Sequence, residues 1–365
     1  DNCNSALPQQ QKDLGLEVKQ SNLCSEITLP TNEERTAVCC LSSVNVEKFD
    51  DWSKDEQFIE DLVTMLDNVL EQFIESAVDT AHYALGSYRA NAERFKNYLK
   101  EDKNAYRKSA FSAYRERSIG LGAMGFHSYL QSKAVPFEGL RATSINHQVF
   151  KHIKEKAVDA SKKLANDRGE APDMVGSGLR NAHLLAVAPN ASSSIICNGT
   201  SPSIEPSRAN VYPHKTLSGS YKVQNKHLKN LLESKNKNTV EVWKDIAAHE
   251  GSVQHLDFLT DEEKEVFKTA PELNQIWIVE HAHQRQQYIC QSQSVNLFFI
   301  PPKATEPQET HDAFLQYIND VHWYGAKNLK SLYYLRSDAA RATENVNIKI
   351  PRINLGEVEC IACEG

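Results

Sequence analysis

The sequence predicts an α/β fold in which amphipathic helices alternate with short buried strands. Long segments carry apolar residues three and four positions apart, which is the spacing of an amphipathic helix. Between them lie apolar or β-branched runs of four to six residues, typical of strands buried in an α/β core. The 365 residues are 40% hydrophobic and 24% charged, which fits a folded protein with one large domain or two or three smaller ones.

Apolar spacing and helix-end signals together predict five helices. They are residues 56–84, residues 143–168 with Gly169 as the stop, a short helix opened by a capping box of Thr260 and Glu263, a helix through Ile276 and His281 with Pro271 in its first turn, and a helix capped by Thr310 that ends near Gly325.

Four buried strands are expected between these helices, at residues 36–41, 184–188, 295–300 and 332–335. Residues 344–365 have no helical period and few large apolar residues, so we expect a mobile tail after a folded part that covers residues 1–343.

No apolar run approaches the ~18 residues of a membrane span, and the first residues lack the basic and apolar segments of a signal peptide. A cytoplasmic protein that is not bound to a membrane is therefore expected.

Charge and cysteine content limit the classes of ligand and compartment. The formal net charge of −7 provides no general attraction to nucleic acid or to anionic membranes, so a phosphate-bearing ligand needs a local site. Eight cysteines are too few for a disulfide scaffold in a chain of this length. The thiols are expected to be reduced, and either buried or used in chemistry.

The first candidate site is the segment 20–30, where a thiol lies two residues from an amide and two from a carboxylate. In an extended chain Asn22, Cys24 and Glu26 point the same way and converge on one ligand. A surface loop with an incidental cysteine is the alternative.

The second candidate is the pair Cys39 and Cys40 on an expected strand, where only one of the two can face a given pocket. Ordinary buried core thiols are the alternative there.

The third candidate is an anion site directly after the expected strand 184–188. Small and hydroxylated residues at a helix start can present backbone N–H groups and hydroxyls to phosphate oxygens. A helix cap followed by a polar loop is the alternative. The residues concerned are Asn190, Ala191, Ser192, Ser193 and Ser194.

Two further candidates lie toward the C-terminus. Tyr333 and Tyr334 are neighbours on an expected strand and form either a redox pair or ordinary packing residues. Cys360 and Cys363 form a CxxC pair in the expected tail, either an exchanging dithiol or half of a zinc site. No second CxxC is present to complete four zinc ligands, which favours the dithiol and leaves no expected metal site in this chain.

These five features, in this order, resemble the C-terminal half of the catalytic subunit of class I ribonucleotide reductases. Any one of them is weak evidence, whereas all five in the family's order span nearly the whole chain. The matching motifs are Ser21-Asn22-Leu23-Cys24-Ser25-Glu26-Ile27, Ala37-Val38-Cys39-Cys40-Leu41-Ser42, Pro189 to Ser194 followed by Ile204-Glu205-Pro206, Tyr333-Tyr334-Leu335-Arg336, and the Cys360 and Cys363 pair.

The resemblance implies a role for each candidate residue. Cys24 corresponds to the thiyl radical that removes the 3′ hydrogen of the ribose, Glu26 to the base for the 3′-hydroxyl proton, and Asn22 to a hydrogen-bond partner of the ribose hydroxyls. Tyr333 and Tyr334 correspond to the relay that brings the radical from an external generator.

The remaining residues correspond to the reducing and binding groups. Cys39 matches one of the two cysteines that reduce the 2′ carbon, because the motif places this thiol directly before a small residue and then Leu-Ser. Cys360 and Cys363 match the dithiol that reduces the active-site disulfide again, and residues 190–194 match the diphosphate-binding loop.

The resemblance also implies a fold and partners. The family fold is a ten-stranded α/β barrel of two five-strand halves with a central finger loop, of which this chain supplies the later strands. The expected activity is ribonucleoside-diphosphate reduction. The expected partners are a diphosphate substrate, a separate chain with the N-terminal half of the subunit, a metal-containing radical-generating small subunit, and a thioredoxin- or glutaredoxin-type reductant. An artificial fragment of a longer subunit is the alternative to a separate chain, and the composition favours the separate chain. No cofactor is expected on this chain.

Several alternatives to a class I enzyme differ in the residues they need. The cobalamin-dependent sister class makes its radical without a tyrosine relay, and the glycyl-radical class lacks the tail dithiol. A degenerate, non-catalytic half-subunit is expected to have lost Asn22, Cys24 or Glu26, and all three are present. A redox or zinc module acting only through Cys360 and Cys363 is a further alternative, which metal content can test.

Overall fold

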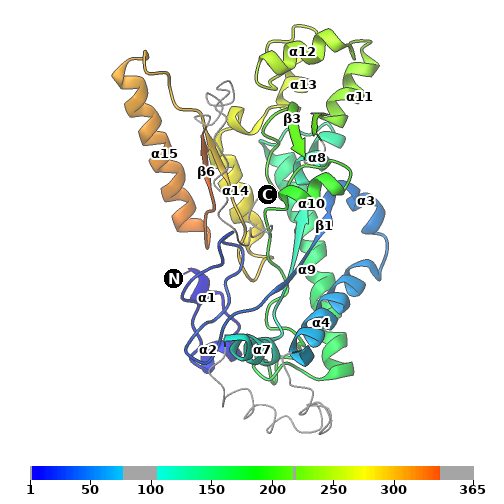
Figure 1. The fold of residues 1–365 in the computed structure, drawn as a ribbon, viewed down its shortest axis with the longest axis vertical. Helices are drawn as coiled ribbons and strands as arrows, with labels where there is room; N and C mark the ends of the chain where they lie inside the picture. The colour runs from blue at the N-terminus through cyan, green and yellow to red at the C-terminus, as the bar shows by residue number, and fades with distance from the viewer. Residues whose placement is uncertain (1, 77–104, 217–218, 338–365) are drawn as a thin grey trace.

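A computed structural model describes residues 2–76, 105–216 and 219–337, and its centre is an array of parallel strands (Figure 1). Strand β1, Cys40–Asn45, pairs in parallel with β2, Ile119–Met124. Parallel bridges then join β2 to residues 184–187 and those residues to residues 291–294. The last segment leads into β5, Leu297–Phe299, which pairs in parallel with β6, Leu335–Ser337.

Within residues 2–76, 105–216 and 219–337, five parallel segments thus lie side by side in the order in which they occur in the chain. Parallel neighbours joined through helices are the pattern of an α/β protein. The α/β prediction is confirmed, and the number of strands is the one expected for half of the barrel.

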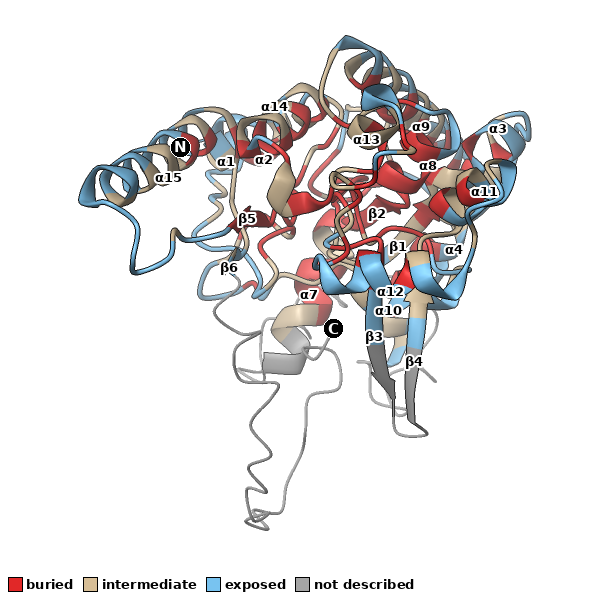
Figure 2. Cartoon of the chain, turned by 90° about the horizontal axis from the view of Figure 1, so that it is seen from above, coloured by how far each residue is buried: buried red, intermediate tan, exposed pale blue. Residues whose placement is uncertain are grey.

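Helices cover this array and share one apolar core with it. Val63, Leu70, Leu121, Val149 and Val279 are fully buried members of that core. Buried residues concentrate around the central strands, whereas α15 at the edge of the molecule is mostly exposed or half-buried (Figure 2). The covering helices are α4 (Phe58–Ser76), α7 (Ala105–Glu116), α8 (Phe126–Ser132), α9 (Leu140–Arg168), α14 (Gln275–Gln286) and α15 (Gln308–Asn328).

A small lobe lies at one end of the molecule, at the top of Figure 1. It has its own apolar cluster around Trp243 and Ile246, separate from the main core. We use "small lobe" for its elements, which are the antiparallel strands β3 (Val211–Thr216) and β4 (Gly219–Gln224) and the helices α11 (Lys226–Ser234), α12 (Val240–Ala248) and α13 (Asp261–Val266).

Short helices complete the described part of the chain. They are α1 (Asn2–Ser5), α2 (Gln9–Asp13), η1 (Val46–Lys48), α3 (Phe49–Trp52), α10 (Ala191–Ile196) and η2 (Ala270–Glu272). Of the helices described, none combines the length and the apolar character needed to cross a membrane.

Local sequence signals predicted several of these elements well. The helix expected at 143–168 is α9, with Gly169 directly after it. The capping box before α13 is present, with Glu263 N donating to Thr260 Oγ1 and Thr260 N donating to Glu263 Oε2. The helix expected at 56–84 is confirmed as α4, and residues 77–84 lie outside the described part of the chain, as does the expected tail at 344–365.

Other expected boundaries are wrong. The strand expected at 36–41 begins at Cys40, opposite the first residue of its partner β2. Pro271 lies in the separate turn η2, and α14 begins only at Gln275, where the Asn274 side chain accepts a hydrogen bond from Ile276 N. Thr310 does not cap α15, because its own N–H already donates to Pro307 O within the first turn.

The strands toward the C-terminus are shorter than expected. The strand expected at 295–300 is β5, Leu297–Phe299, and the strand expected at 332–335 begins only at Leu335. β2 was not expected at all, because Gly120 and Gly122 interrupt its apolar run.

Candidate active site

The finger loop around Cys24 is a tight turn and not an extended strand. Ser25 N donates to Asn22 O (3.1 Å), and Ile27 N donates to Asn22 Oδ1 (3.0 Å). Ser25 has a left-handed backbone (φ 65°) and its carbonyl accepts from Ser331 Oγ (2.8 Å). The expectation that Asn22, Cys24 and Glu26 share one face of an extended chain is therefore wrong, because the Asn22 side chain closes a turn.

Cys24 and the two tyrosines form a continuous series. The Cys24 thiol donates to Tyr333 Oη over 3.5 Å, and the centroids of the Tyr333 and Tyr334 rings are 3.9 Å apart. Tyr333 is half-buried, whereas Tyr334 is 45% exposed. Burial raises the pKa of the Tyr333 hydroxyl and the hydrogen bond to Cys24 raises it further, so the phenol stays protonated. The series runs from the half-buried Cys24 through the half-buried Tyr333 to Tyr334 at the surface.

One segment, residues 291–296, holds the finger loop and the tyrosines together. Ser292 N donates to Glu26 O (2.9 Å), and Ser294 Oγ donates to Cys24 O and to Glu26 Oε2. Further along the same segment, Val295 O accepts from Tyr333 N (2.9 Å) and Asn296 Oδ1 accepts from Tyr334 N (3.1 Å). We call residues 291–296 the linking segment.

The linking segment was not predicted as part of the site. Gln291, Ser292, Gln293, Ser294 and Asn296 are all nearly or fully buried. Five buried polar side chains directly before an apolar strand are unusual, and buried polar groups need partners. That pattern is the sequence signal that could have identified this segment.

Cys39 also contacts the linking segment. Gln291 Nε2 donates to Cys39 Sγ (3.4 Å) and to Ile119 O (3.0 Å). Burial raises the pKa of the Cys39 thiol, so it stays protonated. Gly120 on β2 leaves the space for this sulfur, since a Cβ at that position would lie 3.0 Å from Cys39 Sγ and 2.3 Å from Leu41 Cδ2. Cys40, by contrast, packs against the main core.

The anion-site candidate begins at a left-handed residue. Asn190 has φ 53°, and its side chain donates to Ser43 Oγ (2.9 Å) and Ala188 O (3.0 Å) instead of capping α10. The side chains of Ser192 and Ser193 are exposed, whereas Ser194 is buried and its hydroxyl donates to Ala191 O.

The strand before this candidate pairs with the linking segment. Val187 N donates to Ser292 O (3.1 Å), and Ser294 N donates to Val187 O (2.9 Å). Three of the five candidate regions therefore contact the linking segment directly, and the strand before the anion-site candidate pairs with it, while Cys360 and Cys363 lie outside the described residues.

Glu205 joins this arrangement from the loop after α10. It is buried, and its Oε1 accepts from Asn296 Nδ2 (2.6 Å), the residue that also bonds Tyr334 N. Burial raises the pKa of Glu205 from 4.5 to about 8, although the charge of Arg336 and the hydrogen bond from Asn296 act in the opposite direction. The carboxyl group is thus largely neutral at neutral pH.

We expect Glu205→Gln to flatten the pH dependence of stability. Between the unfolded pKa near 4.5 and the folded pKa of about 8, the folded chain holds a proton that the unfolded chain has lost. Rising pH therefore lowers the free energy of unfolding in this window, by at most about 1.4 kcal/mol per pH unit. Glutamine matches the neutral acid in shape and has no proton to lose.

Urea unfolding between roughly pH 6 and pH 9 measures this slope. Glu306→Gln, at an exposed carboxylate, serves as the control and should keep the wild-type slope. Equal slopes in the wild type and Glu205→Gln would contradict the raised pKa.

Comparisons with known proteins agree on one family. Residues 1–177 and 172–335 match the ribonucleotide reductase barrel domain. The chain is 46% identical over its full length to the ribonucleoside-diphosphate reductase large subunit of Invertebrate iridescent virus 3 and 43% identical to the putative large subunit of Frog virus 3. It covers 53% and 59% of those two proteins, so it spans little more than half the length of these relatives.

A solved structure gives the same result. The alpha subunit of the Actinobacillus ureae class Id ribonucleotide reductase superposes on this chain with a TM-score of 0.76 and 37% sequence identity. The match covers 93% of this chain and 57% of that subunit. By sequence and by fold, the chain belongs to the ribonucleotide reductase family and corresponds to the barrel domain of its large subunit.

Proposed function

We propose that this chain is the catalytic part of a class I ribonucleoside-diphosphate reductase, which makes 2′-deoxyribonucleotides for DNA synthesis. The observation that carries the proposal is the series Cys24, Tyr333 and Tyr334, with a 3.5 Å contact between sulfur and phenol and 3.9 Å between the rings. A tyrosine relay ending at a cysteine distinguishes this class from the cobalamin-dependent and glycyl-radical classes.

The proposed reaction begins with hydrogen-atom transfers. Tyr334 passes the radical to Tyr333, and the Tyr333 radical takes the hydrogen atom of the Cys24 thiol and becomes a phenol again. The Cys24 thiyl radical then removes the 3′ hydrogen of the ribose, while Glu26 accepts the 3′-hydroxyl proton. The buried Glu26 carboxylate is oriented for this role by Ser294.

Reduction and binding use the remaining groups. The 2′-hydroxyl leaves as water, and Cys39 with a second cysteine supplies two electrons and two protons and ends as a disulfide. Cys24 then returns its hydrogen atom to the 3′ carbon and becomes a thiyl radical again, and Glu26 returns the proton to the 3′ oxygen. Asn22 binds the ribose hydroxyls. Residues 190–194 hold the diphosphate, and the first N–H groups of α10 are free of intrahelical acceptors, as at any helix start.

The adjacent cysteines provide a matched test of this proposal. We expect Cys39→Ser to lower steady-state deoxynucleotide formation by at least about 100-fold, because serine cannot form the disulfide. Cys40→Ser should keep near-normal turnover, since Cys40 packs in the core and makes no contact with Gln291 among the described residues. Equal losses in both variants, or loss only in Cys40→Ser, would contradict the assignment.

The barrel needs further strands on both sides of this array. Within the described residues, β1 and β6 each pair with one neighbour only, and an open parallel edge leaves backbone groups unpaired. We propose that a separate polypeptide with the N-terminal half of the subunit supplies these strands and the second reducing cysteine. Under oxidising conditions a disulfide between Cys39 and that chain should appear on a non-reducing gel.

The tail is proposed to be a flexible segment, residues 344–365, beyond the barrel part at 1–343. We expect Cys360→Ser or Cys363→Ser to abolish turnover driven by thioredoxin or glutaredoxin and to spare turnover driven by a small dithiol, which can reach the active-site disulfide directly. The rate of deoxynucleotide formation, measured separately with the protein reductant and with the small dithiol, tests this difference between the reductants. Equal loss with both reductants would indicate a structural role for the pair.

The radical is proposed to come from a metal-containing small subunit that docks where Tyr334 is exposed, so this chain binds no cofactor of its own for the reaction. The proposed site of action is the cytoplasm, where thiols stay reduced. No nucleic acid or membrane takes part.

A further inference from the structure

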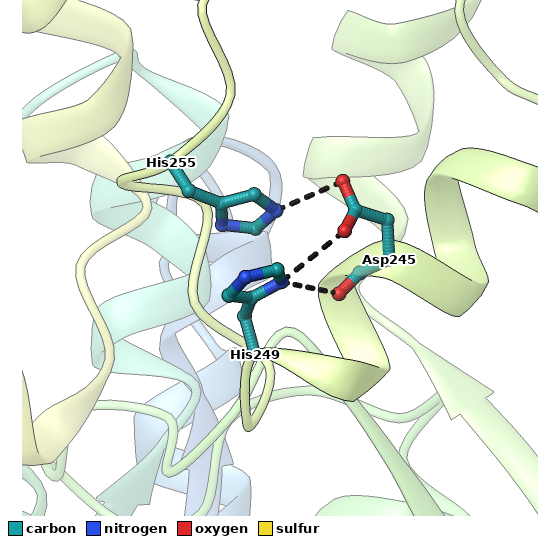
Figure 3. Close-up of side chains that lie close together, drawn as sticks. All are labelled: Asp245, His249 and His255. Carbon is teal, nitrogen blue, oxygen red and sulfur yellow. Dashed lines mark hydrogen bonds and ion pairs between the residues drawn. The ribbon is translucent and has the colours of Figure 1, made fainter.

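Three titratable side chains in the small lobe gather at the end of α12 (Figure 3). Asp245 lies on α12, His249 directly follows that helix, and His255 lies in the loop before α13. His255 Nε2 is 3.0 Å from Asp245 Oδ2, and His249 Nδ1 is 3.2 Å from Asp245 Oδ1. The two imidazole rings are stacked, with centroids 3.7 Å apart and planes 21° from parallel. One carboxylate thus faces two imidazoles.

We propose that Asp245, His249 and His255 bind a divalent cation of the zinc class. Zn²⁺ takes imidazole nitrogens and carboxylate oxygens at about 2.0–2.2 Å in a tetrahedral arrangement. Two corners of such a tetrahedron are roughly 3.3–3.6 Å apart. The observed N···O separations of 3.0 and 3.2 Å are close to that spacing, and the three ligand atoms lie within 4.8 Å of one another.

The charge of the cluster suits a cation. Among the described residues, Asp245 pairs with no lysine or arginine, so its negative charge is met only by the two histidines. His249 Nδ1 also lies 2.9 Å from the Asp245 carbonyl oxygen. A bound cation takes the place of the proton that His249 shares with these oxygens. Two nitrogens and one oxygen leave a fourth position for water.

The backbone that carries these ligands is held without the cation. On α12 the neighbours Trp243 and Ile246 are buried, and on either side of His255 the residues Val253 and Leu256 are buried in the same cluster. Gly251 N donates to Ile246 O (2.8 Å), which closes the loop between the two histidines. Coordination therefore requires only rotation of the exposed Asp245 and His249 and the half-buried His255, since the three side chains are 25–51% exposed.

The test is titration of the chain with Zn²⁺ alone, near neutral pH, by calorimetry. Cys360→Ser and Cys363→Ser are both introduced first, so that the tail thiols do not bind the metal. In this background we expect one equivalent of Zn²⁺ to bind, with an affinity at least tenfold lower in Asp245→Asn and in His255→Gln. His311→Gln on α15, away from the cluster, is the matched control and should bind as the background does.

A thermal melt provides the second readout. Zn²⁺ should raise the melting temperature of the background and of His311→Gln, and should not raise that of Asp245→Asn or His255→Gln. The proposal would be overturned if the background protein bound no Zn²⁺. It would also be overturned if Asp245→Asn and His255→Gln both still bound one equivalent of Zn²⁺. Circular dichroism shows that each variant is folded, and neither outcome depends on reductase activity.

Discussion

Cys24→Ser is expected to abolish nucleotide reduction while the protein stays folded. Serine preserves the shape and the hydrogen bond to Tyr333 Oη, but its O–H bond is far too strong to give up a hydrogen atom to a tyrosyl radical. We expect a loss of at least about 10⁴-fold, equal to about 5.5 kcal/mol of transition-state free energy. Deoxynucleotide formation by the assembled enzyme, with its partner chains and reductant, measures the loss.

Folding is checked separately in this experiment. The urea unfolding midpoint of Cys24→Ser should match that of the wild type. Ser294 bonds the Cys24 carbonyl oxygen and the Glu26 carboxylate, and Ser292 N bonds the Glu26 carbonyl oxygen. These bonds do not involve the Cys24 sulfur. Cys3→Ser, at a thiol that donates weakly to Lys330 O among the described residues, is the matched control and should keep its activity. Measurable turnover by Cys24→Ser would exclude a thiyl radical at this position.

Tyr333→Phe is expected to stop turnover with almost no effect on substrate binding. The ring still packs against Tyr334, but the hydroxyl 3.5 Å from the Cys24 sulfur is lost, and with it the group that exchanges a hydrogen atom with the thiol in the described part of the chain. Tyr334→Phe should behave in the same way. The expected loss is at least about 10³-fold in turnover, with the dissociation constant of the nucleotide unchanged.

Tyr288→Phe is the control for loss of a tyrosine hydroxyl. Tyr288 Oη lies 3.2 Å from His147 Nδ1, and among the described contacts it touches neither Cys24 nor Tyr334. Its turnover should remain close to that of the wild type. If Tyr333→Phe also kept near-normal turnover, the two tyrosines would be packing residues and the relay would have to follow another route.

Elements with strong local signals were predictable from the sequence. α9 has a long apolar period and a glycine stop, and the capping box of Thr260 and Glu263 marks the start of α13. Strand β2 was not predictable from the sequence, because Gly120 and Gly122 lower its strand propensity. Those glycines are needed for close approach to Cys39 and to the Ala186 carbonyl, a requirement that exists only in the assembled sheet.

The site residues were predictable one motif at a time, whereas their arrangement was not. The turn at Cys24 depends on Asn22 bonding Ile27 and on Ser331, more than 300 positions along the chain, bonding Ser25. The linking segment has no motif of its own. Its role comes from lying between the finger loop, the tyrosines and residues 184–187 in three dimensions.

Successive residues of the linking segment contact two different sets of partners. Ser292, Ser294 and Asn296 serve the finger loop, Glu205 and the tyrosine segment, whereas Gln291 reaches Cys39 and Gln293 accepts from the buried Arg285. Inserting or deleting a single residue would exchange the two sets, as in any extended chain. Evolution and protein engineering can therefore vary individual side chains here more freely than they can vary the length of the segment.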